Sequence, residues 1–369
     1  MKVLHVISDT NIGGAGVLLC TLLKHFDRAK VESIVALPKG SALIARIDAH
    51  SIPCVELAAS PDRFGVHSVE ELSRLIKAEK IDVVHANAAI CARIAGKRCG
   101  IAVVHTRHCC FPIHKNLWTL PAHVVKTLVN RILSDRAIAT AEAAAENLVA
   151  LGVPKKKISL IINGSDPIRS ISEEEKTAFM MRWNIPKDAF LLGMSARLVE
   201  CKGHEILLRA TSMLRDRMPN QTFCILFAGE GPDRTRLERL TAELGLLNVV
   251  RFLGFLEDMA PFYRSIHLNV NCSTGTETSC LALSEGMSAG VPMIVSDFGG
   301  NRAMIGDSCA GLIYPAGDSD ALGNAILCVA GDRALMERMQ KAALHRYQSH
   351  YTASDMARQV EAVYEQICK

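Results

Sequence analysis

The stretch LNVNCSTGTETSCLALSEGMSAG, residues 268–290, carries the pattern that decides the fold. Its first four residues form a short apolar run typical of a buried strand, and the small polar residues that follow favour a turn. After the turn, Leu281, Leu283 and Met287 are spaced as on one face of a helix. A strand, a turn and a helix in this order predict an α/β domain with a parallel sheet.

The same alternation of strand-like runs and helical spacings extends along the chain. In the first half the expected strands are Val3–Ile7, Ser33–Leu37, Cys54–Leu57, Val83–His85, Val103–Thr106, Ala137–Thr140 and Ile158–Ile162. After Pro186 they are Leu191–Met194, Phe223–Phe227, Val249–Leu253, Leu268–Val270, Met293–Val295 and Leu312–Tyr314. Because 369 residues exceed the roughly 250–300 that one core supports, we expect two Rossmann-like, doubly wound α/β domains facing each other across a cleft.

Composition sets the domain boundaries that we expect. Residues 1–168 form the first domain and residues 188–351 the second. The polar, glutamate-rich stretch 169–187 is the expected linker between them. The last helix, about residues 352–369, is long enough to pack back onto the first domain.

Composition also bounds the class of protein. Apolar residues make up 49% and charged residues 22%, and no segment offers the roughly 18 uninterrupted apolar residues of a membrane span, so a soluble globular protein is expected. The apolar run Val3–Ile7 is too short for a secretory signal. Thirteen cysteines without any CxxC pair favour reduced thiols in a cytoplasm over a disulfide framework or a structural zinc site.

Charge is distributed unevenly along the chain. Up to residue 170 there are 22 Lys/Arg and 14 Asp/Glu, and after it 20 and 24. A basic first half fits an anionic membrane or an acidic substrate, and it fits an ordinary solvated surface equally well. Residues 110–120 and 124–129 mix apolar, aromatic and basic side chains, which fits a surface that dips into a membrane. A helix packed on its own domain explains the same pattern and is slightly favoured.

Two glutamates, Glu277 and Glu285, lie eight positions apart across the turn and helix of the opening stretch. Thr278 or Ser279 is the natural N-cap, so backbone amides there would sit at the positive end of the helix dipole, where phosphate oxygens bind. Carboxylates accept hydrogen bonds from hydroxyl groups. The arrangement therefore predicts a ligand with a phosphate centre and sugars on either side, a sugar nucleotide. Its expected contacts from this segment are Thr278, Ser279, Cys280, Leu281 and Glu285.

Two further loops carry phosphate-binding chemistry. Arg197 and Lys202 follow the second domain's first strand, and a planar guanidinium with a point charge suits a diphosphate leaving group without any metal. Gly13 and Gly14 follow the chain's first strand and fit either an anion-binding loop or a tight turn. GxGxxG is not satisfied because its third glycine would fall on Leu19, so a dinucleotide oxidoreductase loses its main support.

Other strand ends add weaker signals. His108 follows a strand of the first domain and is better placed for a role at the cleft than most of the histidines, although such residues are more often structural. Gly229 and Gly231 follow another strand, where they either let a flat base approach the backbone or serve as ordinary turn glycines.

In this order the motifs resemble the retaining GT-B glycosyltransferases of family 4, over nearly the whole chain. The matching positions are Gly13-Gly14 for the glycine loop, His108 for the first-domain histidine, Asn163-Gly164 for a turn, Arg197 and Lys202 for the diphosphate pair, Glu277 and Glu285 for the Glu-x7-Glu motif, Gly290-Val291-Pro292 and Gly299-Gly300. Asn301-Arg302-Ala303 departs from the Pro and Glu that often follow the last glycine pair, so no role is transferred there. Thr278-Ser279-Cys280 also departs from the family's pattern, so the family's preference for a donor sugar is not transferred to this chain.

The resemblance implies a reaction. Glu285 would hold the ribose and Glu277 the donor hexose, and the leaving phosphate itself would help to deprotonate the acceptor hydroxyl. Glu277 and His108 would then be catalytic by positioning and by stabilising charge. The first domain would serve the acceptor and the second the nucleotide sugar, with a UDP-sugar as substrate, no cofactor, no metal and no nucleic-acid partner. A glycan or lipid-linked acceptor, polysaccharide synthesis and a cytoplasmic location at the inner membrane face follow by analogy.

Two other functions fit the same architecture. A non-hydrolysing UDP-sugar 2-epimerase binds a UDP-sugar between two such domains and requires no acceptor. A non-catalytic nucleotide-sugar-binding subunit would bind without turnover, and the intact site residues disfavour it without excluding it.

Overall fold

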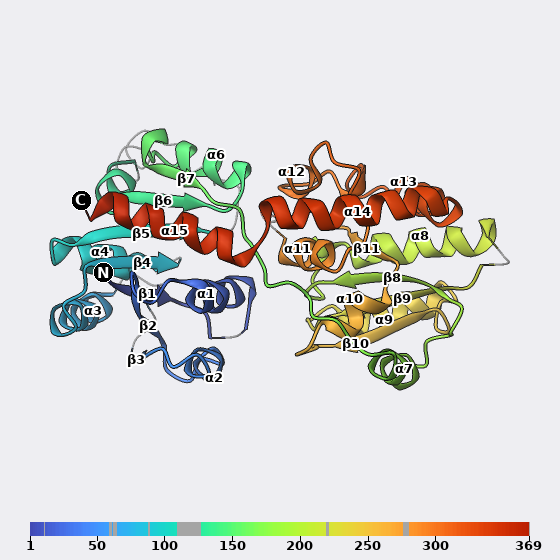
Figure 1. Ribbon diagram of the computed structural model, residues 1–369, viewed down its shortest axis with the longest axis horizontal. Helices are drawn as coiled ribbons and strands as arrows, with labels where there is room; N and C mark the ends of the chain where they lie inside the picture. Colours follow the sequence, from blue (N-terminus) through green and yellow to red (C-terminus); the bar gives the residue numbers. More distant parts are fainter. Residues whose placement is uncertain are drawn as a thin grey trace. The chain divides into compact units, whose positions relative to one another are not determined.

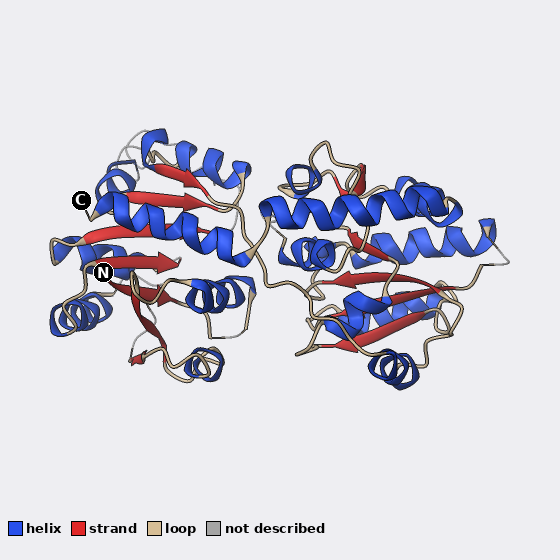
Figure 2. Ribbon diagram, viewed as in Figure 1, coloured by secondary structure: helices blue, strands red, loops and turns tan. Residues whose placement is uncertain are grey.

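The computed structural model divides into two compact units, which Figure 1 colours along the sequence. Unit 1 comprises Met1–Ser165 with Ala353–Lys369, and unit 2 is Asp166–Thr352. The residues that the structure describes are 1–10, 12–58, 61, 65–87, 89–108, 127–218, 221–275 and 280–368. Each unit is a parallel sheet with helices on both faces, so the predicted fold class of two doubly wound α/β domains is confirmed (Figure 2).

Unit 1 is built on a parallel sheet that has seven strands within the described residues, in the order β3-β2-β1-β4-β5-β6-β7. The strands are β1 (Lys2–Ile7), β2 (Glu32–Pro38), β3 (Cys54–Leu57), β4 (Val83–Asn87), β5 (Ala102–Arg107), β6 (Arg136–Ala139) and β7 (Ile158–Leu160). Strand order reverses between β1 and β4, which pair in parallel. Ligands of such sheets bind at the carboxyl ends of the strands beside this reversal.

Helices cover both faces of this sheet. They are α1 (Gly14–His25), α2 (Ile44–Asp48), α3 (Val66–Ala78), α4 (Ile90–Arg98), α6 (Glu142–Ala150), the 3-10 turn η2 (Lys155–Lys157) and α15 (Ala353–Ile367). On one face α3 and α4 pack Leu72 and Ala92 against Leu4 and Val84. Alternate strand residues point to opposite faces, so His85 lies on the other face, where Tyr364 of α15 contacts it.

Unit 2 holds a parallel sheet with six strands in the described part, ordered β10-β9-β8-β11-β12-β13. They are β8 (Phe190–Ser195), β9 (Phe223–Ala228), β10 (Val250–Gly254), β11 (Leu268–Asn271), β12 (Met293–Ser296) and β13 (Gly311–Tyr314). The helices are α7 (Glu173–Arg182), the 3-10 turn η3 (Glu200–Lys202), α8 (His204–Arg217), α9 (Arg234–Glu243), α10 (Ala260–Ser265), α11 (Leu281–Ser288), α12 (Asn301–Ile305), α13 (Ser319–Gly331) and α14 (Arg333–His350). Here the order reverses between β8 and β11, so their carboxyl ends mark the expected binding position.

The stretch 169–187 differs from the linker that its polarity suggests. Ser172 and Glu175 form a capping box at the start of α7, and the three glutamates of its first turn favour the positive end of the helix. Phe179 then anchors α7 in a core cluster of unit 2. Charged residues here lie on the exposed face of a packed helix, and the whole stretch belongs to unit 2.

The C-terminal helix α15 packs with unit 1, beside α1 (Figure 1). Its first residue, Ala353, donates its amide to the carbonyl of Ser165, and Glu361 accepts the amide of Asp27 at 2.7 Å. Among the helices that the structure describes, none is both long and apolar enough to cross a bilayer.

Candidate active site

The loops after β8 and β11 meet at the strand-order reversal of unit 2. Thr274 donates its amide to the carbonyl of Cys201 at 2.9 Å. Gly203 adopts φ 72°, and a Cβ at this position would lie 2.1 Å from the carbonyl oxygen of Cys272. Only glycine permits this approach, which holds the end of η3 against the segment that leads into α11.

The predicted phosphate-binding cations lie in this first loop. Arg197 is exposed directly after β8, and Lys202 is half-buried at the end of η3. The main chain beside Arg197 is fixed because Leu198 donates its amide to Glu230 and accepts one from Asp233. A firmly held backbone is the support that a phosphate-binding arginine needs.

The glycines after β9 explain how this loop is held. A Cβ on Gly229 would lie 2.1 Å from the carbonyl oxygen of Ala196, and one on Gly231 would lie 2.2 Å from that of Leu198. Both glycines therefore let the β9 loop pack on the Arg197 loop. Of the two roles that the sequence allowed for these glycines, a contact with a base and an ordinary turn, the packing explains the turn.

The N-cap of helix α11 lies one residue after Ser279 and two after Thr278, the two predicted N-cap residues. Its first residue is Leu281 and its N-cap is Cys280, which is extended and makes no side-chain cap hydrogen bond. The Cys280 amide donates to the sulfur of Met304 at 3.3 Å, and the Leu283 amide returns to the Cys280 carbonyl. The predicted N-cap is thus corrected, and the helix N-terminus available to an anion is its first turn, starting at Leu281.

Glu285 lies in the middle of α11 and is half-buried. The hydroxyl of Tyr263, a fully buried residue of α10, lies 2.9 Å from Glu285 Oε2. Burial raises the pKa of Glu285 to about 7, against the opposing effect of that hydrogen bond. A carboxylate that is poorly hydrated can accept hydrogen bonds from hydroxyl groups of a ligand in place of water.

A buried polar network supports the start of α11 from behind. Asn301, which is fully buried, directs Nδ2 to Asn271 Oδ1 at 3.1 Å and to Ser296 Oγ at 3.2 Å. Asn271 in turn donates to the Cys280 sulfur at 3.3 Å. Asn301 is the residue where the sequence departs from the expected motif, and the structure shows that it ties the ends of β11 and β12 together.

Unit 1 brings its predicted residues to its own strand-order reversal. Gly13 is the N-cap of α1, and Gly14 is its exposed first residue, where a Cβ would meet no atom within 4 Å. His108 follows β5, and its Nε2 lies 2.9 Å from Oδ1 of Asn87 at the end of β4. Burial lowers the pKa of His108 to about 4, so the imidazole is neutral at physiological pH.

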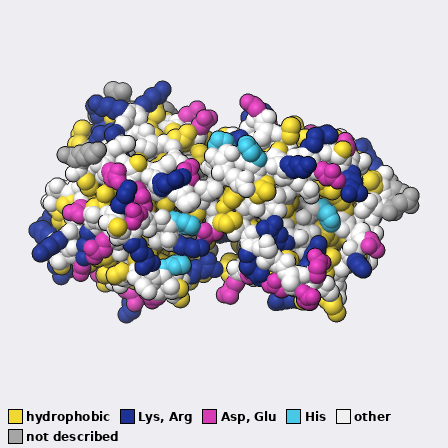
Figure 3. Space-filling view, viewed as in Figure 1, with side chains coloured by type: hydrophobic (Ala, Val, Ile, Leu, Met, Phe, Trp, Pro, Cys, Tyr) yellow, Lys and Arg dark blue, Asp and Glu magenta, His cyan; other side chains and the backbone are white. Residues whose placement is uncertain are grey.

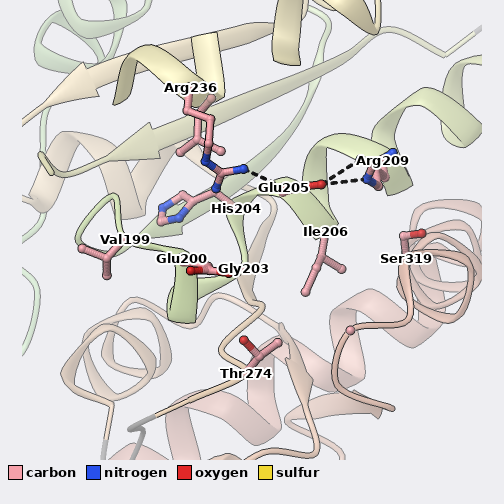
Figure 4. A pocket seen from close by; sticks show the side chains of 12 residues that line it. Val199, Glu200, Gly203, His204, Glu205, Ile206, Arg209, Arg236, Thr274 and Ser319 are labelled. Atoms are coloured by element: carbon pink, nitrogen blue, oxygen red, sulfur yellow. Dashed lines mark hydrogen bonds and ion pairs between the residues drawn. The ribbon is translucent and has the colours of Figure 1, made fainter. Parts of the chain in front are cut away.

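A well-defined cavity of unit 2 has another location. It measures about 220 Å³ and is lined by residues at the N-terminus of α8, by Arg236 and by Thr274 (Figure 4). Of the predicted donor-binding residues that the structure describes, none is among those that line it. Glu205 bonds both Arg209 and Arg236, and Glu200 also lines the cavity, so its two guanidinium groups are balanced by two carboxylates. The cavity therefore has no surplus positive charge for a diphosphate.

Three of the predicted site residues, Glu277, Thr278 and Ser279, lie outside the described residues, as does most of the segment 110–129. Sequence reasoning missed Asn87 and Tyr263, which contact His108 and Glu285. The signal for Asn87 was its position at the end of a strand beside the reversal. The contact of Tyr263 spans 22 residues and leaves no local signal.

Sequence profiles of two families match the chain. The family described as Glycosyl transferases group 1 matches residues 175–346, and Glycosyltransferase Family 4 matches residues 12–169. A D-inositol 3-phosphate glycosyltransferase of Stackebrandtia nassauensis is 27% identical over 299 residues, covering 74% of this chain and 67% of that protein.

Solved structures share the fold. Anabaena Alr3699/HepE in complex with UDP superposes with a TM-score of 0.85 at 21% identity, covering 99% of this chain and 100% of that one. A glycosyltransferase from Rickettsia africae superposes with a TM-score of 0.85 at 20% identity, covering 100% and 98%. The two sheets and these superpositions define the GT-B fold, and the family profiles mark the chain as a glycosyltransferase. Since the two profiles together span nearly all of its length, the chain belongs to glycosyltransferase family 4.

Proposed function

We propose that this chain is a retaining glycosyltransferase that moves a hexosyl-type group from a UDP-sugar to a hydroxyl acceptor. The observation that carries the proposal is the arrangement at the β8–β11 reversal of unit 2. There the Arg197–Lys202 loop is held against the segment leading into α11, and Glu285 lies within that helix. A cationic loop, a helix N-terminus and a buried carboxylate suit a diphosphate with a ribose beside it.

Each group would have a distinct task. Arg197, Lys202 and the first turn of α11 would neutralise the diphosphate as its bond to the sugar breaks. Glu285 would accept hydrogen bonds from the ribose hydroxyls, and Glu277 would hold the transferred hexose. The acceptor would attack on the face that the leaving phosphate vacates, and its proton would pass to that phosphate. Because two cations and helix amides supply the positive charge, the reaction would require no metal and no cofactor.

The choice of UDP draws on the comparisons. Anabaena HepE has been solved in complex with UDP and with UDP-glucose. The comparisons say less about the acceptor, although one relative is a D-inositol 3-phosphate glycosyltransferase. We propose a hydroxyl of a glycan or lipid-linked oligosaccharide, as in cell-surface polysaccharide synthesis.

We also propose that unit 1 binds peripherally to the inner face of a membrane. Leu128 and Ile132 are more than half exposed on the helical residues 127–132. Lys157 donates to the Arg131 carbonyl, which places η2 with its exposed lysines beside them. In Figure 3, Lys and Arg side chains gather at the end of unit 1 that carries α6 and β7. Apolar and basic side chains on one surface suit an anionic lipid headgroup layer.

The proposed function is tested by NMR, which monitors the donor sugar in the absence and in the presence of acceptors. UDP-glucose, UDP-galactose and UDP-N-acetylglucosamine are each incubated with the protein, and the anomer of any released or transferred sugar is read at early times. The proposal expects the donor's own anomeric configuration in the product, and chelating agents should leave the rate unchanged. An inverted product would refute the retaining mechanism. Conversion of the UDP-sugar to its 2-epimer without an acceptor would identify an epimerase, and UDP binding without turnover would identify a binding subunit.

A further inference from the structure

The backbone carbonyl of Ala282, in the first turn of α11, lies beside two side chains from neighbouring elements. The amide Nδ2 of Asn269, a residue of β11 that is 1% exposed, donates to this carbonyl at 2.8 Å. The hydroxyl of Tyr263 on α10 lies 3.1 Å from the same oxygen and 2.9 Å from Glu285 Oε2. Tyr263 has one proton for these two acceptors, so its surroundings decide which of them receives it.

Asn269 has one possible orientation at this carbonyl. A carbonyl oxygen only accepts hydrogen bonds, so the NH2 end of the Asn269 side chain faces Ala282. Ala282 and Gly286 both belong to α11, and in a regular helix a carbonyl also accepts the amide four residues further on. A carbonyl oxygen has two lone pairs, which Asn269 and the Gly286 amide then occupy. The proton of Tyr263 is therefore directed to Glu285.

Gly286 leaves the room that Asn269 needs. A Cβ on Gly286 would clash with Nδ2 of Asn269. A larger residue at this position would therefore push the amide of Asn269 away from the Ala282 carbonyl. Glycine is otherwise unfavourable inside a helix, and the close approach of Asn269 gives this one a packing role.

The other neighbours of Tyr263 and Glu285 agree with this direction. Burial raises the pKa of Tyr263 well above its ordinary value, and Glu285 and Cys280 raise it further, so the hydroxyl keeps its proton. Ser195 lowers this pKa, as a donor to the hydroxyl oxygen does, and so does not compete for the proton. Among the described residues of α10, α14, β11 and β12, which pack near α11, only Tyr263 alters the pKa of Glu285 besides burial. Arg264, the cation of α10, bonds backbone carbonyls instead.

We infer that Asn269 is a positioning residue for the nucleotide site, because by occupying the Ala282 carbonyl it directs the single proton of Tyr263 to Glu285. The carboxylate is then held through Oε2, and Oε1 keeps its lone pairs for the hydroxyl groups of a ligand. This chain of contacts lies within unit 2 alone. That the ligand hydroxyls belong to the ribose of UDP rests on the proposed function.

The first measurement titrates the Glu285 carboxyl itself. In protein labelled with ¹³C at the glutamate carboxyls, its NMR signal is assigned by its loss in Glu285→Gln and is followed against pH without ligand. Asn269→Ala frees a lone pair of the Ala282 carbonyl, so the Tyr263 proton is shared and the pKa of Glu285 should rise by about one pH unit. Tyr263→Phe removes that proton and should raise the pKa by at least as much. Because both changes act through one proton, the double variant should match Tyr263→Phe alone.

A second variant and a control accompany Asn269→Ala. Gly286→Ala keeps Asn269 and displaces only its amide, so it should raise the pKa of Glu285 in the same direction even if Asn269→Ala fails to fold. Ser284→Ala is the matched control, since it also removes a polar contact from α11, but the Ser284 hydroxyl bonds the Leu281 carbonyl. It should leave the titration of Glu285 unchanged.

UDP binding adds a readout that a merely structural role of Asn269 would not move. The ribose hydroxyls are to be bound by the ionised carboxylate, whose population near pH 7 depends on the pKa of Glu285. A rise of this pKa from about 7 to about 8 lowers the ionised fraction about fivefold at pH 7 and by only about a tenth at pH 9. Asn269→Ala should therefore weaken UDP binding about fivefold at pH 7 and hardly at all at pH 9.

An unchanged titration of Glu285 in Asn269→Ala and Gly286→Ala would overturn the inference, as would a double variant whose shift is the sum of the two single shifts. An equal loss of UDP affinity at pH 7 and pH 9 would also overturn it, because Asn269 would then support the fold of the site in general. The expected titrations in a protein that binds no UDP would support the hold of Asn269 on Glu285 and refute the proposed function.

Discussion

Glu285→Gln should make unit 2 more stable at alkaline pH. The pKa of Glu285 rises from its usual 4.5 to about 7 because the carboxylate is buried. A raised pKa means that the folded protein disfavours the charged form, so stability that is present below pH 4.5 is lost as the pH rises through about 7. Glutamine cannot ionise, and it keeps an oxygen that accepts from the Tyr263 hydroxyl, so the variant avoids this loss.

The size of the effect follows from the shift. At about 1.36 kcal/mol per unit, the charge destabilises the fold by roughly 3 kcal/mol at pH 8 and by less than about 1 kcal/mol at pH 5. Because Glu285 is only half-buried, water reduces these values, and we expect a gain of roughly 1–3 kcal/mol at pH 8.

The assay is urea unfolding at pH 5 and pH 8, followed by tryptophan fluorescence in a Trp118→Phe background. The chain has two tryptophans, and Trp183 packs against a core cluster of unit 2, so the remaining signal reports on that unit. Glu243→Gln removes an exposed glutamate from the same unit and controls for net charge. Equal stabilities of wild type and Glu285→Gln at pH 8, or a gain that is as large at pH 5, would refute a Glu285 carboxyl whose pKa is raised by burial.

Three further predictions concern the same site. Gly203→Ala should destabilise unit 2 by about 1–3 kcal/mol and weaken UDP binding, because the added Cβ would lie 2.1 Å from the carbonyl oxygen of Cys272. An unchanged midpoint of urea unfolding together with an unchanged affinity for UDP would contradict the packing of the loops after β8 and β11. Arg197→Lys should weaken UDP binding by about tenfold in calorimetry, because an ammonium lacks the planar fork for two phosphate oxygens, and equal affinity would show that Arg197 does not touch the diphosphate. Tyr263→Phe removes the hydrogen bond that lowers the pKa of Glu285, so the midpoint of the plot of UDP affinity against pH should lie at higher pH than in wild type. An unchanged midpoint would show that Glu285 does not contact UDP.

Short apolar runs were enough to locate the strands of both sheets, because parallel strands buried on both faces are continuous in apolar residues. The sequence also predicted a site at the ends of strands, and the structure places the segments concerned beside the reversal of strand order in unit 2. Arg197 and the existence of a helix after β11 were predicted in this way, although not the residue at which that helix starts.

Contacts between distant residues were beyond sequence reasoning. The start of α11 depends on Met304, 24 residues further along, whose sulfur accepts the Cys280 amide. Tyr263 reaches Glu285 only because α10 packs beside α11. The helix α7, by contrast, could have been predicted, because Ser172 and Glu175 have the spacing of a capping box, but the local polarity outweighed that signal.

Isothermal titration of wild type and Glu285→Ala with UDP is the most direct test of a nucleotide-sugar site at the β8–β11 reversal, with GDP, ADP and NAD titrated separately as comparison ligands. The account predicts that UDP binds wild type, that NAD does not, and that Glu285→Ala loses at least about tenfold in affinity, which is 1.4 kcal/mol. Binding of NAD alone, or identical UDP affinity in the two proteins, would contradict a nucleotide-sugar site at the β8–β11 reversal.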